Sequence, residues 1–164
     1  MDIRDGVLVV RERALAAARK ASWLPPLLIR LCLAAVFIPS GWGKLHDLQK
    51  VTDFFTELGI PWPHGNAVVV ALSELGCGTL LLVGLASRLA ALPLIVSMAI
   101  AIVTAKRADI GGPVDLFAVD ELMYAVLAMA IVVLGPGAVS ADGIVARLLL
   151  HPNEQQQQRK GDRS

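Results

Sequence analysis

The sequence predicts an all-α fold, a transmembrane four-helix bundle with a short amphipathic helix between spans 1 and 2. Composition is the first reason: 55% of the 164 residues are hydrophobic, only 18% are charged, and the mean hydropathy is +0.64. Soluble domains of this size carry more charge and shorter apolar runs. The second reason is four apolar runs of about membrane-spanning length, near residues 26–43, 66–87, 89–105 and 116–134.

Residues 1–24 form a basic N-terminal segment. Its RERALAAARKA stretch combines helix-forming residues with a basic face, so we expect it to lie on the membrane surface. No short apolar core with a cleavage site follows these charges, which argues against a signal peptide. The first span then runs over about 26–43, contains Arg30 and Pro39, and is closed by Lys44.

The segment DLQKVTDFFTELG predicts a short amphipathic helix after the first span. Its apolar residues share one side, and Gly59 can end the helix before PWP forces extended backbone. We expect this helix to pack on the mouth of the bundle or rest at the interface, with Trp62 at the level of the lipid headgroups. The apolar residues are Leu48, Val51, Phe54, Phe55 and Leu58.

The second and third spans form a tight antiparallel hairpin, because Ser87-Arg88 leaves almost no loop between them. Gly76, Gly78 and Gly84 in the second span are expected to allow close helix approach. KRADIGGPVD forms the next loop, and GPG at 135–137 ends the fourth span. The membrane domain therefore covers 25–143. A tail over 144–164 follows, whose glutamine run is expected to be disordered.

Lysine and arginine placement predicts that both termini are cytoplasmic. With the N-terminus inside, ten cationic residues fall on the cytoplasmic side and four on the other, leaving Arg30 uncounted within the membrane. The ten are Arg4, Arg11, Arg13, Arg19, Lys20, Arg88, Arg147, Arg159, Lys160 and Arg163, and the four are Lys44, Lys50, Lys106 and Arg107.

Several ionisable residues fall inside the predicted spans. At about 1.5 Å of rise per residue, Glu74 lies roughly 12 Å and Glu121 roughly 8 Å below the outer edge. Lys44 can reach inward along its aliphatic stem from the same side. Arg30 enters from the cytoplasmic side, so its guanidinium either snorkels to the cytoplasm or points toward Glu74 through water.

Two hypotheses account for these charges. The first is a polar pocket that opens to the outside and binds a quinone head group, holds a metal or relays protons. The second is a set of interhelical ion pairs and hydrogen bonds that only fix the bundle. The sequence leaves both open. The pocket residues would be Glu74, Asp120 or Glu121, Lys44 and, if it points inward, Arg30. Tyr124 can join the face of either acid. Of the two adjacent acids we favour Glu121.

Other chemistry is less well supported by the sequence. His46 and His64 flank the outer loop and are weak metal candidates, since loop histidines are usually solvated. Cys32 and Cys77 lack metal or redox spacing and are interpreted as packing residues. No haem-type histidine pair, nucleotide loop or basic stripe with interleaved aromatics is present, so nucleic acid is not an expected partner.

Taken together, residues Ile29 to Asp142 resemble the DoxX family of small four-span bacterial membrane proteins. The resemblance rests on Arg30 followed by Phe37, Gly41 and Lys44, on FFTELGIP, on ELGCGTLLLVGLASRLAAL, and on Glu121 to Tyr124 with the terminal LGPGAVSAD. Cys77 stands at a usual glycine position of the family pattern. The order and spacing of these pieces carry the assignment.

The resemblance implies a location in the bacterial plasma membrane and a role that depends on partners. Family members are associated with the membrane part of thiosulfate:quinone oxidoreductase, with thiol-handling and oxidant-defence enzymes, or with copper-related operons. The family's polar positions fall on Arg30, Lys44, Glu74, Arg88 and Glu121, of which Arg88 fits a cytoplasmic hairpin anchor. No covalently bound cofactor is implied.

The leading hypothesis is therefore an integral membrane accessory subunit of a redox system, which contacts quinone or a redox partner protein. If it takes part in catalysis, it does so within a quinone-linked oxidoreductase and not as a stand-alone enzyme. The alternative is a non-enzymatic scaffold that recruits a soluble enzyme, or a carrier of a small molecule or metal. The sequence leaves the substrate and the oligomeric state open.

Overall fold

The computed structural model describes residues 3–107 and 110–150, and within them every regular element is an α-helix. The polar tail expected after residue 150 lies outside the described residues. The helices are α1 (Ile3–Lys20), α2 (Leu24–His46), α3 (Leu48–Glu57), α4 (Pro63–Val83), α5 (Ser87–Thr104), α6 (Pro113–Ala118), α7 (Asp120–Leu134) and α8 (Ala141–Leu150).

Three of the described helices are long and apolar enough to cross a membrane, namely α2, α4 and α5. They correspond to the first three predicted spans and confirm the membrane class and the all-helical fold. The short helix expected after the first span is also present as α3. Pro25 and Pro26 stand at the start of α2, where a missing N–H is harmless, and the helix continues through Pro39.

The fourth predicted span, 116–134, is not one helix. Val119 takes an extended conformation, with φ −83° and ψ 131°, and separates α6 from α7. Asp120 and Glu121 then occupy the first turn of α7. Carboxylates are favoured at a helix N-terminus because they complement the macrodipole. The two acids that were expected within the span therefore mark the start of a new, 15-residue helix.

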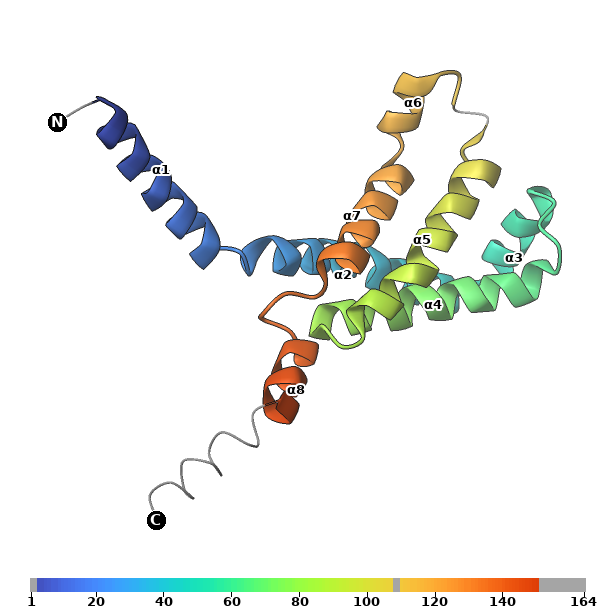
Figure 1. Ribbon diagram of the computed structural model, residues 1–164. Coiled ribbons are helices and arrows are strands. Elements are labelled where there is room, and N and C mark those ends of the chain that lie inside the picture. Colours follow the sequence, from blue (N-terminus) through green and yellow to red (C-terminus); the bar gives the residue numbers. More distant parts are fainter. Residues whose placement is uncertain (1–2, 108–109, 151–164) are drawn as a thin grey trace, which may run out of the picture.

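The three long apolar helices and α7 pack as two pairs, and Figure 1 shows both. The α2–α4 pair and the α5–α7 pair make the most extensive contacts. In Figure 1, α5 and α7 rise at an angle from α2 and α4, so the pairs diverge toward α3 and α6. We call the end where α4 turns into α5 the closed end, and the end beside α3 the open end.

Two glycines allow the close approach of α2 and α4. A Cβ at Gly41 would lie 2.4 Å from the backbone nitrogen of Leu75. A Cβ at Gly78 would lie 3.1 Å from a side-chain carbon of Ile38. Gly78 was expected to act in this way, whereas the expectation for Gly76 was wrong because nothing lies within 4 Å of a Cβ built there.

The distribution of apolar residues fits a lipid environment. Small residues such as Ala71 and Ala91 are fully buried between helices, while Val96 and Val103 are more than half exposed. A protein in water would expose fewer large side chains of this kind on contiguous helix faces. In lipid, the hydrophobic effect no longer favours burying large apolar side chains between helices, and close packing through small residues holds the helices together.

Candidate functional site

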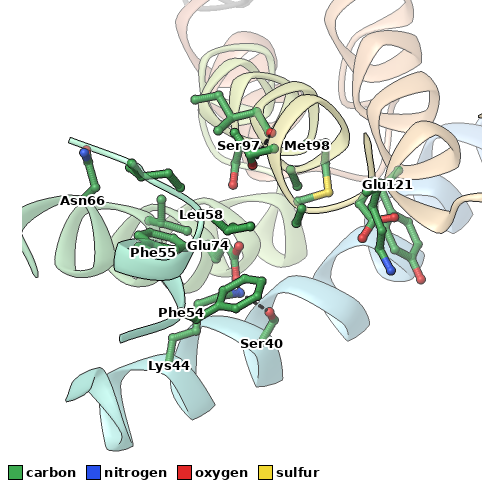
Figure 2. A pocket seen from close by; sticks show the side chains of 18 of the residues that line it. Ser40, Lys44, Phe54, Phe55, Leu58, Asn66, Glu74, Ser97, Met98 and Glu121 are labelled. Atoms are coloured by element: carbon green, nitrogen blue, oxygen red, sulfur yellow. Dashed lines mark hydrogen bonds and ion pairs between the residues drawn. The ribbon is translucent and has the colours of Figure 1, made fainter. Parts of the chain in front are cut away.

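A cavity of about 810 Å³ lies between the two helix pairs at the open end. Figure 2 shows its walls. Side chains from α2 and α4 form one side, α5 and α7 form the other, and α3 covers the cavity from above α4. The cavity exists because the helix pairs diverge here, and residues far apart in the sequence meet in it.

The polar floor of the cavity is an ion pair between two helices. The Lys44 ammonium on α2 contacts the Glu74 carboxylate on α4, and it also donates a 2.6 Å hydrogen bond to Oγ of Ser40. The Glu74 side chain is only 3% exposed, whereas that of Lys44 is 27% exposed. A carboxylate at this depth requires a cationic partner, and Lys44 supplies it while keeping access to the cavity.

Most of the remaining wall is apolar. Phe54, Phe55 and Leu58 of the α3 segment line the cavity, as do Val70 of α4 and Met98 of α5. The apolar side of α3 therefore faces the pocket, and its polar side is turned outward. An apolar chamber with a few polar groups at one place is the usual form of a small-molecule site.

Glu121 and Tyr124 of α7 and Lys106, just beyond α5, add polar groups to the opposite wall. The rings of Tyr124 and Phe37 meet edge to face with centroids 6.0 Å apart. Of the adjacent acids, Glu121 is half-buried and lines the cavity, while Asp120 is exposed and does not line it. The preference for Glu121 over Asp120 agrees with this geometry.

Arg30 does not reach the pocket. It is buried at the closed end and donates hydrogen bonds to the carbonyl oxygens of Leu81, Leu82, Pro136 and Val139, at 2.7 to 3.0 Å. The expectation that its guanidinium snorkels to the cytoplasm or points toward Glu74 is therefore wrong. The end of α4 leaves helix carbonyls without intrahelical partners, and the loop after α7 presents two more carbonyls; a planar guanidinium with five N–H groups can donate to several of them.

Two residues near Arg30 have separate roles. Gly84 leaves space for the guanidinium, and Asp142 caps the start of α5. Gly84 has φ +78°, and a Cβ there would lie 2.4 Å from Nη2 of Arg30. Asp142 accepts hydrogen bonds from the backbone nitrogens of Ala86 and Ser87, at 2.9 and 3.2 Å. Arg88 is exposed, and its Nη2 would lie 3.0 Å from a Cβ at Gly135. Arg88 thus lies at the hairpin and outside the pocket.

The two histidines lie apart from the pocket. His46 contacts the ring of Trp42 with centroids 4.5 Å apart, and its Nδ1 lies 3.0 Å from the Trp42 carbonyl oxygen. His64 Nδ1 lies 3.3 Å from the hydroxyl of Thr52. Within the residues that the structure describes, no group of three or more His, Cys, Asp or Glu side chains could hold a metal ion.

Sequence reasoning missed several residues of the site. Ser40 precedes Lys44 by four residues, so the helical period alone could have placed it beside the ammonium. Lys106 was interpreted only as a loop cation. The contacts of Asp142 with the α4–α5 hairpin had no local signal, because they join residues more than fifty positions apart.

The fold and the site define a small helical membrane protein with a Lys–Glu ion pair, whose carboxylate is buried, beside a largely apolar pocket. The DoxX family profile matches residues 26–107, half of the chain, and the chain belongs to the DoxX family. It is 39% identical over 85 residues to an uncharacterized membrane protein of Mycobacterium tuberculosis. The match covers 50% of this chain and 52% of that relative, so it spans about half of the relative's length. No solved structure matches the chain at a significant level.

Proposed function

We propose that this protein is a membrane accessory subunit of a redox system and that its pocket receives the head group of a quinone. The observation that carries the proposal is the buried Lys44–Glu74 pair at the floor of an otherwise apolar cavity. A quinone combines carbonyl oxygens with an apolar ring and tail, and the cavity offers a matching donor and matching walls.

The hydrogen-bonding capacity of Lys44 supports this assignment. An ammonium carries three N–H donors, and Ser40 and Glu74 account for two of them. The third can donate to a carbonyl oxygen in the cavity. The cavity volume of about 810 Å³ falls within the range of small-molecule sites, roughly 300–1,000 Å³.

We further propose that α6 and α7 together make a fourth crossing, with both termini in the cytoplasm of a bacterial cell. The extensive packing of α7 against α5 supports this arrangement, and so does the excess of Lys and Arg on the side of the termini. In this topology the pocket opens near the outer surface. A cysteine introduced at His46 should react with an impermeant thiol reagent from outside the cell. Reaction from the cytoplasmic side only would reverse the topology.

Binding of decylubiquinone to the purified full chain in lipid nanodiscs tests the main proposal. We expect Lys44→Met to bind about tenfold more weakly, because it removes the charged donor to the quinone carbonyl oxygen. Glu57→Gln is the control, because Glu57 is exposed on α3 and outside the cavity. If the unaltered chain does not bind decylubiquinone, or if Lys44→Met binds it equally well, the quinone site is refuted.

The second candidate function is a scaffold for a soluble partner protein. The outward side of α3 favours it, because this helix presents exposed polar residues beside the pocket mouth: Asp47, Gln49, Lys50, Asp53 and Glu57. Copurification of a soluble protein that is lost when residues 48–57 are replaced by a flexible linker would support the scaffold. Retention of the partner after this replacement would contradict it.

A further inference from the structure

We propose that Glu121 sets which head group the pocket prefers: a ring that carries an O–H or N–H donor, such as a hydroquinone, binds more tightly than a ring without one. This inference rests on the proposed ligand-binding function and adds a second polar contact, opposite Lys44 and Glu74. The site then holds its ligand at two points, one on each helix pair.

The Glu121 carboxylate lacks a partner of its own. It lines the cavity from α7 and is half-buried. Across the described parts of the chain, no side chain or backbone group makes an ion pair or hydrogen bond with it. A half-buried carboxylate without a donor of its own keeps unused acceptor oxygens toward the cavity, so this side of the cavity favours a ligand that supplies an O–H or N–H donor.

The neighbours of Glu121 do not meet this need. Lys106 lines the same cavity but does not come within ion-pairing distance of it. Tyr124 presents its ring to Phe37. A purely structural explanation for Glu121 also exists, because a carboxylate in the first turn of α7 complements the positive end of the helix macrodipole. Asp120 occupies the same helical turn but is exposed and outside the cavity, so the two acids separate the helix-terminus role from the pocket role.

The two walls together define a ligand class. Lys44 has one donor left for an acceptor oxygen, and Glu121 has acceptor oxygens left for a donor. The apolar side chains between them contact a ring or chain. A ring that carries hydroxyl groups satisfies both walls, because a hydroxyl both accepts and donates. A ring that carries only ether oxygens satisfies Lys44 alone.

A pair of matched probes tests the inference. Decylhydroquinone and its dimethyl ether differ in the hydroxyl donors, and their binding to the full chain in nanodiscs is measured calorimetrically without oxygen. We expect the unaltered chain to bind the diol about tenfold more tightly than the ether, as for one hydrogen bond to a charged group. Glu121→Met should abolish this difference, and the control Asp120→Asn should keep it.

The outcomes separate this inference from the general function. Equal binding of the two probes by the unaltered chain, or a preference that persists in Glu121→Met, overturns the role of Glu121 and leaves the pocket intact. Binding of neither probe overturns the ligand site and the role of Glu121 together. Glu121→Gln retains the size of the side chain and loses its charge, so a reduced preference in this variant, with an unchanged thermal unfolding midpoint, excludes misfolding as the cause.

Discussion

The two ends of the bundle use buried charges in opposite ways. At the closed end, the guanidinium of Arg30 is surrounded by four backbone carbonyls, and the glycine at position 84 leaves space only for that guanidinium. At the open end, Lys44 and Glu74 pair beside a cavity, and Glu121 lines its far wall without a partner. At the closed end each nitrogen of the guanidinium has a carbonyl partner within the chain, whereas the open end retains a carboxylate without a partner.

This contrast indicates which intramembrane charge serves the fold. A buried cation that contacts main chain from two separate segments fixes their positions relative to its own helix. A partly accessible pair beside a cavity is adapted to interact with something else. Charge within the membrane is therefore not sufficient to identify a functional site; the number of unsatisfied donors and acceptors distinguishes the two ends.

The largest effect is expected at the closed end. Arg30→Met should lower the free energy of unfolding by about 3 kcal/mol, because several buried carbonyls lose their donor at once. Denaturation in mixed micelles with increasing SDS measures this change. Arg88→Met is the matched control and should change stability by less than about 0.5 kcal/mol, because Arg88 is exposed. An Arg30→Met protein as stable as the original would show that the closed end does not depend on this residue.

The next largest effect is expected at the close contact between α2 and α4, the helix pair that connects the two ends. Gly41→Ala should destabilise the protein by about 2 kcal/mol, since the added Cβ overlaps the backbone of α4 and forces the helices apart. Gly43→Ala, two residues further along, adds its Cβ to open space and should be neutral or stabilising by up to about 1 kcal/mol. The same SDS titration compares them. Equal stabilities of the two variants would contradict the close contact of α2 with α4.

A smaller effect is expected from Asp142, whose carboxylate caps the start of α5. Asp142→Ala removes the acceptor for the backbone nitrogens of Ala86 and Ser87. Loss of such a cap costs about 1 kcal/mol. Hydrogen exchange of the amides at the start of α5 should accelerate in this variant and remain unchanged in Asp53→Ala, which alters an exposed residue of α3. Unchanged exchange would mean that the cap is not maintained in solution.

The smallest change in stability is expected at the open end. Glu74→Gln should lower the free energy of unfolding by less than about 1 kcal/mol, because glutamine can still accept from Lys44 and the partly exposed ammonium can reach water through the cavity. Thermal unfolding in nanodiscs measures it. A loss as large as that of Arg30→Met would make the Lys44–Glu74 pair structural and would remove the contrast between the two ends.

The sequence by itself determined the membrane class, the all-helical fold and the places of three apolar helices. These follow from local properties: an apolar run of sufficient length must form a helix in lipid, because its backbone groups find no other partners. Depth along the helices also placed Glu74 near Lys44. The break at Val119 was missed because the apolar run continues across it. The only local signal for a helix start at this place is the pair of acids Asp120 and Glu121.

The tertiary structure alone decided what each charge does. Arg30 and Lys44 have similar positions in the sequence pattern, since both are single cations at the two ends of one span. Their partners come from α4 and from the loop after α7, and these are set by how the helix pairs cross. Because the pairs converge around Arg30 and diverge beside Lys44, one cation is enclosed by main chain and the other faces a cavity.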